Sequence, residues 1–175
     1  MKKAVIFDLD GLLIDSEVIS HRLYDELLHR YGKSVTVAEY ARDYSGKTGV
    51  ANMTNVIARY NLPITVEEGL TWEVAREKEL LQDVQLKPGV VEYLTLLKHQ
   101  GARMCVVTAT PRHLVEICLS RFDLLPYFDF LLTCDEVGTG KDHPDVFFEA
   151  ARRLNAAPAQ IAVFEDSLQA AQEVH

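Results

Sequence analysis

Two pairs of carboxylates stand where short apolar runs end, near opposite ends of the sequence. Asp8 and Asp10 follow an apolar run at residues 4–7. Glu165 and Asp166 directly follow another such run. A carboxylate at the end of a buried strand is costly unless it is paired or binds a metal, and two close together nearly require a cation or a shared proton. The first pair is therefore a candidate nucleophile or metal ligand with a general acid–base partner. The second pair is a candidate set of oxygen ligands for Mg²⁺.

Both pairs also have an ordinary structural explanation. The first pair could lie in a loop turn in which an aspartate caps the helix at Ser16. Asp166 and Ser167 are favoured N-cap residues, so the second pair could simply begin a helix. Capping accounts well for Ser167, but it does not explain why two carboxylates directly follow Phe164.

Two further polar residues follow apolar runs in the middle of the chain. Thr108 ends the run at 103–108, where a hydroxyl and exposed backbone N–H groups can bind an anion. Lys141 follows the run at 128–133 after a short polar loop, and its ammonium suits a phosphate oxygen or an aspartate nucleophile. Each has an alternative: Thr108 favours strands, with Thr110 then serving as a helix cap, and most loop lysines are solvated.

The four apolar runs are expected to be buried strands of one open parallel sheet, because helix patterns alternate with them. In such a sheet, ligands bind outside the carboxyl ends of the strands. Carboxylates, a hydroxyl and a lysine that are far apart in the sequence should therefore meet at one edge, as metal-assisted phosphoryl transfer requires. The expected strands are 4–8, 103–108, 128–133 and 161–164, and helices are expected after Pro88-Gly89, Pro111, Pro144 and Ser167.

Residues 16–84 form a helical block between the first and second expected strands. Apolar residues recur there at three- and four-residue steps, which is typical of amphipathic helices, and we find no convincing strand pattern. A helical block beside a site at the strand ends is positioned to act as a lid. His21, Lys47 and Thr48 could face a substrate from this block, although exposed helix or loop positions explain them more simply. The expected domains are a core of residues 1–14 and 87–175 and a cap of residues 15–86.

Composition narrows the possible partners. The chain has 175 residues, 48% hydrophobic and 25% charged, with a formal net charge of −8. These values suit a soluble globular protein and argue against binding nucleic acid or an anionic membrane, although a bound divalent cation would still favour a small anionic substrate. No apolar run approaches transmembrane length. Cys105, Cys118 and Cys134 lack a CxxC spacing and suit reduced core residues of a cytoplasmic protein, which we expect to be a monomer or weak homodimer.

Four segments in order resemble the motifs of one family. The segment FDLDGLLIDSE at 7–17 closely resembles the first motif of the haloacid dehalogenase-like hydrolases, in the branch with β-phosphoglucomutase and sugar-phosphate phosphatases. Thr108 matches the second motif, Lys141 the third, and EDS at 165–167 the fourth. The resemblance covers essentially the whole chain, and four motifs in order are far more specific than any one alone.

The resemblance implies a Rossmann-like α/β core with a helical cap inserted after the first strand. It implies that Asp8 is the nucleophile and forms an aspartyl-phosphate, and that Asp10 protonates the leaving group and then activates water. It also implies that Mg²⁺ is held by Asp8, the backbone carbonyl of Asp10 and Asp166, with Glu165 nearby in support.

The same resemblance implies a phosphate site. Thr108 and the backbone N–H of Ala109 would hold the phosphate, and Lys141 would neutralise charge. This scheme agrees with general chemistry, because a covalent aspartyl intermediate splits one hard displacement into two. The metal and the lysine would stabilise charge on the transferring phosphoryl group.

The sequence departs from the family pattern in three places. Asp142 follows Lys141 where the family usually has proline. Gly-Lys-Thr-Gly at 46–49 stands where phosphoglucomutases carry an arginine that grips a second phosphate, which disfavours a mutase. The sequence ends inside the last expected helix, where relatives continue with a further strand and helix, so we expect a partial chain that lacks a C-terminal edge strand.

The leading expectation is a Mg²⁺-dependent phosphatase acting on a small phosphorylated metabolite, with a sugar phosphate as the expected class. One alternative is a phosphosugar mutase of the β-phosphoglucomutase type. A dehalogenase is disfavoured by Asp10, because dehalogenases of this family lack the second aspartate of the first motif. The non-enzymatic alternative is a phosphometabolite-binding protein that keeps the fold. The sequence does not identify the substrate.

Overall fold

The chain folds into two compact units. The computed structural model describes residues 3–44 and 49–173. One unit contains residues 1–15 and 85–175, and the other contains residues 16–84. These boundaries differ by one or two residues from those expected for a core and a cap. The role of the second unit as a lid stays a prediction.

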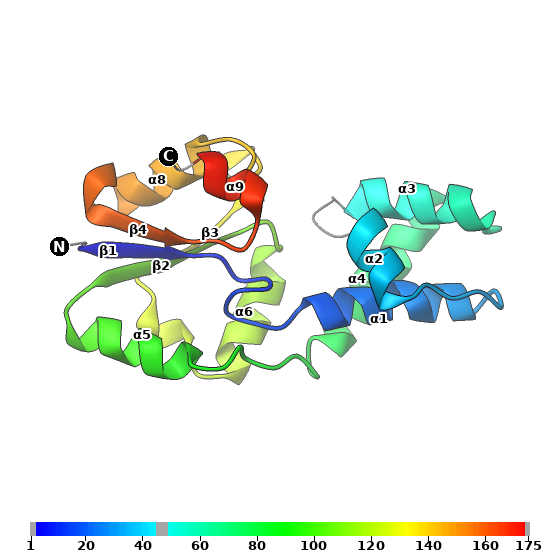
Figure 1. Ribbon diagram of the computed structural model, residues 1–175, viewed down its shortest axis with the longest axis horizontal. Helices are drawn as coiled ribbons and strands as arrows, with labels where there is room; N and C mark the ends of the chain where they lie inside the picture. Colours follow the sequence, from blue (N-terminus) through cyan, green and yellow to red (C-terminus); the bar gives the residue numbers. More distant parts are fainter. Residues whose placement is uncertain (1–2, 45–48, 174–175) are drawn as a thin grey trace. The chain divides into compact units, whose positions relative to one another are not determined.

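A sheet of four parallel strands forms the centre of the first unit (Figure 1). β1 lies inside the sheet and its four residues are all buried, which explains why it is a continuous apolar run. The register pairs Phe7 with both Val106 and Phe164, so the residues that follow these positions emerge at the same edge. The predicted α/β fold with a parallel sheet is confirmed. The strands are β1 (Ala4–Phe7), β2 (Arg103–Thr108), β3 (Phe130–Thr133) and β4 (Ile161–Phe164), in the order β3-β2-β1-β4.

The third strand was predicted two residues too long at its start. It begins at Phe130 because Asp129 bonds to Met104 partly through its side chain. The Asp129 N–H donates to the Met104 carbonyl at 2.7 Å, and the Asp129 carboxylate accepts the Met104 N–H at 2.9 Å. Just before this point, Leu125–Tyr127 forms a short 3₁₀ helix, η1.

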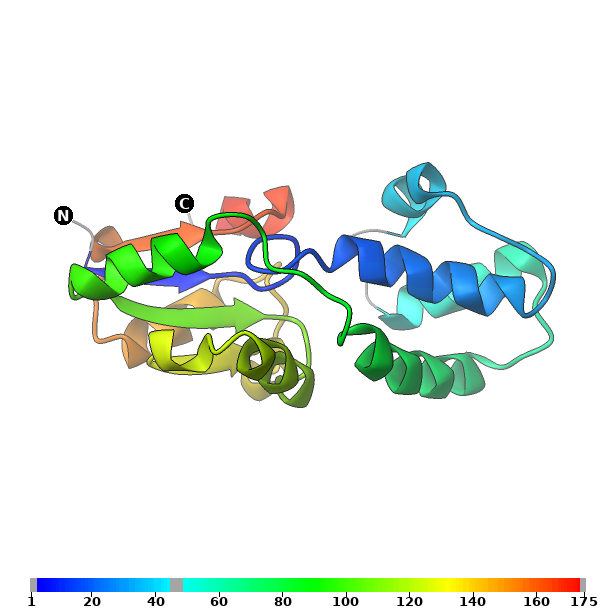
Figure 2. The same cartoon turned by 90° about the horizontal axis from the view of Figure 1, so that it is seen from below.

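Helices cover both faces of the sheet (Figures 1 and 2). α5 (Val90–His99) and α6 (Arg112–Arg121) lie on one face, and α8 (Asp145–Arg153) and α9 (Leu168–Glu173) lie on the other. A second 3₁₀ helix, η2 (Pro158–Gln160), leads into β4. The segment after β3 was predicted as a polar loop, but it begins with a short helix, α7 (Cys134–Val137). This helix ends at Gly138, whose φ of 82° is a left-handed conformation that glycine adopts readily.

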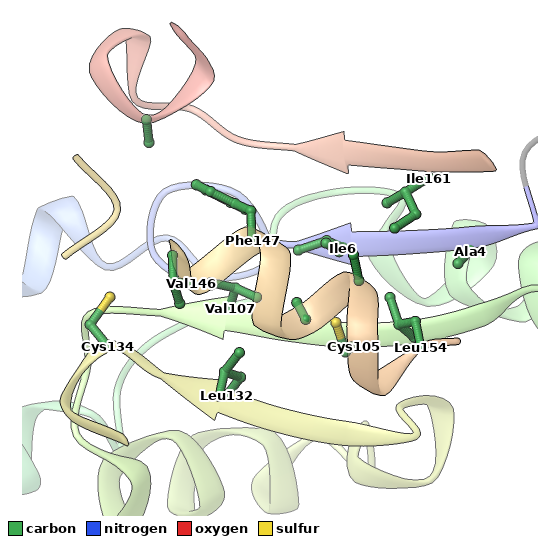
Figure 3. Packing of buried hydrophobic residues seen from close by; sticks show 13 residues of the cluster. Ala4, Ile6, Cys105, Val107, Leu132, Cys134, Val146, Phe147, Leu154 and Ile161 are labelled. Atoms are coloured by element: carbon green, nitrogen blue, oxygen red, sulfur yellow. The ribbon is translucent and has the colours of Figure 1, made fainter. Parts of the chain in front are cut away.

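The core on the α8 side is built from all four strands and mainly from α8 (Figure 3). Side chains that alternate along β1 and β2 point to this face, as the two-residue period of a strand requires. Burying each large aliphatic side chain contributes about 1.5–3 kcal/mol, which fixes the strands and hence their carboxyl ends. The three cysteines are free and buried, as predicted. Main members of the cluster are Ile6, Cys105, Val107, Leu132, Val146, Phe147, Ala150 and Leu154.

In the described part of the second unit, the regular elements are all α-helices. α4 packs against both α1 and α3, and the contact with α3 is close at Gly69, where a Cβ would clash with the Met53 sulfur. α2 and α4 each begin with a capping box, in which Thr36 and Thr65 exchange hydrogen bonds with the glutamate three residues later. The helices are α1 (Glu17–His29), α2 (Val37–Asp43), α3 (Gly49–Tyr60) and α4 (Val66–Leu80).

Within the first unit, the segments that lead to and from the helical unit are tied together. Ile14 and Leu86 form an isolated antiparallel bridge. The Asp15 N–H donates to the Gln85 carbonyl at 2.9 Å, and the Lys87 ammonium lies 2.7 Å from the Asp15 carboxylate. These bonds hold the two segments side by side where the chain crosses between units.

Candidate active site

Three carboxylates gather at the carboxyl ends of β1 and β4. Asp8 directly follows β1, and its N–H continues the ladder by donating to the Phe164 carbonyl at 3.0 Å. Asp8 is only 3% exposed. Carboxylate oxygens of Asp8, Glu165 and Asp166 all lie within 4.8 Å of one another. The parallel register of β1 with β4 therefore brings the first and fourth motif segments together.

Lys141 reaches the same cluster from the loop after α7. Its ammonium lies 2.7 Å from Oδ1 of Asp8 and 3.0 Å from Oε2 of Glu165. The Lys141 side chain is 15% exposed, so this lysine is not a solvated loop residue. The loop lysine alternative is therefore wrong for Lys141, and its side chain neutralises part of the acidic cluster.

The electrostatics of the cluster are dominated by burial. Burial raises the pKa of Asp8 well above its ordinary value, with Lys141 opposing the shift and the Glu165 carboxylate adding to it. Burial alone would lower the pKa of Lys141, but Asp8 and Glu165 raise it above its ordinary value. The Lys141 ammonium thus contacts two of the three carboxylates, those of Asp8 and Glu165.

These residues fit a hard divalent cation. Asp8 and Glu165 share the ammonium of Lys141, and a carboxylate oxygen of Asp166 lies within 4.8 Å of oxygens of both. Carboxylates this close together favour binding a further cation or sharing a proton. Oxygen ligands are also the ones that Mg²⁺ prefers, usually one or two carboxylates with water and substrate phosphate. Asp8, Asp166 and Glu165 are the side chains that would hold it or support it.

Gly11 allows the loop after β1 to approach Asp166. Its φ is +73°, a left-handed conformation that glycine adopts without strain. A Cβ at this position would clash with Oδ2 of Asp166. Gly11 is therefore needed both for the turn and for the close contact between the two acidic segments.

Asp10 meets two hydroxyl groups at the end of β2. Its Oδ2 accepts a hydrogen bond from Oγ1 of Thr110 at 2.6 Å and a longer one from Oγ1 of Thr108 at 3.3 Å. Thr108 is fully buried, and its hydroxyl also accepts the Thr110 N–H at 3.0 Å. Ala109, between them, is exposed.

The alternative that made Thr110 a helix cap is wrong. Pro111 occupies the N-cap position of α6, and no side chain caps this helix. The Thr110 hydroxyl bonds to Asp10 instead. Sequence reasoning therefore missed Thr110 as a neighbour of the candidate general acid, and the only available signal was a hydroxyl near the end of a strand that already carried a candidate residue.

Comparison with known proteins identifies the family. A family model described as haloacid dehalogenase-like hydrolase matches residues 2–172. The chain belongs to this family. A phosphorylated carbohydrates phosphatase of Thermotoga maritima is 33% identical, over 94% of this chain and 76% of that protein. Hexitol phosphatase B of Escherichia coli K12 is 32% identical, over 94% of this chain and 75% of the relative.

A solved structure agrees with this family assignment. CbbY from Rhodobacter sphaeroides, in complex with phosphate, superposes with a TM-score of 0.80 at 26% identity, covering 99% of this chain and 83% of that one. In the described part of this hydrolase, no helix is both long enough and apolar enough to cross a membrane.

The remaining candidate residues of the hydrolase take part in local structure or lie outside the residues that the structure describes. Ser16 precedes α1 without a side-chain capping bond, whereas the Ser167 hydroxyl accepts the Ala170 N–H at 3.4 Å in α9. His21 donates from Nε2 to the Val35 carbonyl at 2.8 Å inside the helical unit. Lys47 and Thr48 lie outside the described residues.

Proposed function

We propose that this hydrolase is a Mg²⁺-dependent phosphomonoesterase that acts on a small phosphorylated metabolite, with a sugar phosphate as the expected class. The observation that carries the proposal is the contact of the Lys141 ammonium with the buried Asp8, at 2.7 Å, in a group of three carboxylates. The two curated relatives, named as phosphatases of phosphorylated carbohydrates and of hexitols, support the substrate class.

In the first step, a carboxylate oxygen of Asp8 attacks phosphorus while the ester P–O bond breaks. The departing oxygen takes a proton from Asp10, so the products are an alcohol and an aspartyl-phosphate. In the second step, water attacks the phosphorus of this intermediate and gives a proton to Asp10, which restores both aspartates. General acid–base help of this kind contributes about 10²–10⁴-fold to the rate.

The surrounding residues would stabilise the charge that moves in these steps. Lys141 touches the nucleophile and can follow its charge onto the phosphoryl oxygens. Thr108 and the exposed backbone at Ala109 would bind the phosphate at the start of α6. Bound Mg²⁺, held by Asp8, Asp166 and the Asp10 carbonyl with Glu165 in support, would offset the phosphate charge.

Turnover by wild type and one variant tests the proposal. A panel of phosphomonoesters is incubated with Mg²⁺, and phosphate release is measured for the wild type and for Asp8→Asn. We expect release from at least one sugar phosphate by the wild type and none by the variant. Asp123→Asn makes the same chemical change at an exposed site with φ of 54°, which asparagine tolerates, and should keep full activity.

The other outcomes separate the alternatives. Equal release by wild type and Asp8→Asn would exclude Asp8 as the nucleophile. Isomerisation of a sugar phosphate that depends on a bisphosphate, without net phosphate release, would support the mutase, and chloride release from haloacids would support a dehalogenase. Binding of phosphometabolites without any turnover would support the non-enzymatic alternative. The cytoplasmic location and the monomeric or weakly dimeric state stay predictions.

A further inference from the structure

The two hydroxyl groups at the end of β2 act on the same oxygen of Asp10. Both Thr108 and Thr110 donate to Oδ2, and neither donates to Oδ1. The two bonds are unequal: at 2.6 Å the Thr110 bond has the length of a charge-assisted hydrogen bond, while the Thr108 bond is 3.3 Å long. Thr110 is therefore the main partner of this carboxylate.

The Thr110 hydroxyl is held in place by its own chain. A residue before proline is restricted to extended conformations, and Pro111 imposes this restriction on Thr110. Its β-branched side chain has few χ1 rotamers. Its N–H is bonded to the Thr108 hydroxyl at 3.0 Å. The position of the donor is thus fixed independently of Asp10.

Phosphate binding would increase the importance of Thr110. A threonine hydroxyl has a single proton to donate. When Thr108 donates that proton to a bound phosphate, it no longer donates to Asp10. Thr110 then remains as the hydroxyl donor on Oδ2, which leaves Oδ1 as the oxygen that exchanges a proton with the leaving group or with water.

We propose that Thr110 is a positioning residue for Asp10, whose hydroxyl holds Oδ2 so that Oδ1 delivers the proton to the departing oxygen. This inference rests on the proposed function, since it takes Asp10 as the general acid. During the first step, the proton moves from Oδ1 of Asp10 to the ester oxygen as the P–O bond breaks. Thr110 itself touches neither the substrate nor the reacting atoms.

The test uses two phosphate esters that differ in their need for an acid. An alkyl phosphate releases a strongly basic alkoxide, which requires the proton, whereas p-nitrophenyl phosphate releases a weakly basic phenolate. The parameter kcat/KM reports events up to phosphoryl transfer and so isolates the acid step. Thr110→Val keeps the β-branched shape without the hydroxyl, and Thr110→Ser keeps the hydroxyl.

We expect Thr110→Val to lower kcat/KM for an alkyl phosphate that the wild type hydrolyses by about 10- to 100-fold, part of what a general acid contributes. The change with p-nitrophenyl phosphate should stay below about 3-fold, because that leaving group needs little acid catalysis. Thr110→Ser should restore most of the lost rate. In an Asp10→Asn background, Thr110→Val should cause no further loss on the alkyl ester, because residues that act as a unit are non-additive.

A control removes a comparable hydroxyl elsewhere in the same unit. The Thr95 hydroxyl bonds to that of Tyr127 at 2.9 Å in a partly buried position on α5. Thr95→Val should leave kcat/KM unchanged for both esters. Retained activity on p-nitrophenyl phosphate shows that a Thr110 variant is folded, and Thr110→Ala provides a second variant in case the valine side chain does not fit.

The outcomes that overturn the inference are distinct from failure of the proposed function. Equal losses on the two esters, or no recovery in Thr110→Ser, would reduce Thr110 to a structural residue while leaving a phosphatase in place. A wild type that releases phosphate from no ester of the panel would reject the phosphatase assignment and the role of Thr110 with it.

Discussion

A buried carboxylate in one unit and a partly buried one in the other show why a raised pKa alone does not make a site. Burial raises the pKa of Asp8 in the first unit and of Glu73 in the helical unit. Glu73 accepts a hydrogen bond from the Tyr24 hydroxyl at 2.7 Å, which a protein core can use simply to satisfy a polar group. Asp8 lies instead beside the ammonium of Lys141 and within 4.8 Å of further carboxylate oxygens.

The difference is that several carboxylates come together at Asp8. Among the described residues, Asp8 belongs to the one group of acidic, histidine and cysteine side chains that can hold a cation together, and Glu73 does not belong to it. Carboxylates that lie close together and away from water cost free energy unless a cation or a proton binds to them. A cluster of carboxylates that persists despite this free-energy cost is expected to have a catalytic or binding role. A single carboxylate with a neutral hydrogen-bond partner is expected to have a structural role.

The largest effect is expected from Asp8→Asn. It should abolish turnover, because an amide cannot form the aspartyl-phosphate. It should not lower the free energy of unfolding in urea, because a neutral side chain of the same shape relieves the repulsion with Glu165. Phosphate release and urea unfolding on the same samples check both parts. A clear loss of stability would mean that Asp8 mainly supports the fold.

A second effect is expected at Gly11, where the two acidic segments meet. Gly11→Ala should strain the backbone by about 1–2 kcal/mol and displace Asp166, so we expect at least a 10-fold loss of turnover with Mg²⁺. Gly101→Ala is the matched control, since Gly101 has φ of +72° and a Cβ there would meet no atom within 4 Å. It should lose similar stability and no activity. Equal activity in the two variants would show that the contact with Asp166 is not required.

Two lysines with the same ion-pair distance should differ in their contribution to stability. Lys141 and Lys87 each lie 2.7 Å from an aspartate, but the Lys141 pair is buried and the Lys87–Asp15 pair is a third or more exposed on both sides. Removing one partner of a buried pair costs about 3 kcal/mol, so Lys141→Met should lose roughly that much. Lys87→Met should lose less than about 1 kcal/mol.

Urea unfolding of both lysine variants, with and without Mg²⁺, measures these losses. Added Mg²⁺ should recover part of the loss in Lys141→Met, since a bound cation replaces the missing charge. It should have no such effect on Lys87→Met. Similar losses in the two variants would show that burial does not separate the two pairs.

The sequence predicted the parts of this site that lie next to buried strands. β1 and β4 are apolar runs that end in carboxylates, and the parallel pairing brings Asp8 to Asp166 without further information. The contact of Lys141 was not predictable in the same way, because it depends on α7 and on the loop that follows it. The bond from Thr110 to Asp10 joins side chains that are 100 residues apart, and such side-chain geometry leaves no periodic signal.

The smallest effect is expected at Glu73, which tests the other half of the comparison. Because burial raises its pKa in the folded state, the folded protein binds more protons than the unfolded chain above the ordinary glutamate pKa. Its contribution to stability is therefore present at low pH and is lost as the pH rises through the folded-state pKa. Glu73→Gln keeps an oxygen for the Tyr24 hydroxyl and removes this titration.

Unfolding in urea at pH 5 and pH 8 should show a smaller decline in stability for Glu73→Gln than for the wild type. The change should be smaller than the loss in Lys141→Met, because Glu73 is only partly buried and keeps its neutral partner. Turnover of the sugar phosphate should persist, in contrast to Asp8→Asn. Loss of turnover in Glu73→Gln with unchanged stability would show that Glu73 also contributes to catalysis. It would contradict the distinction between a cluster of carboxylates and a single carboxylate with a neutral partner.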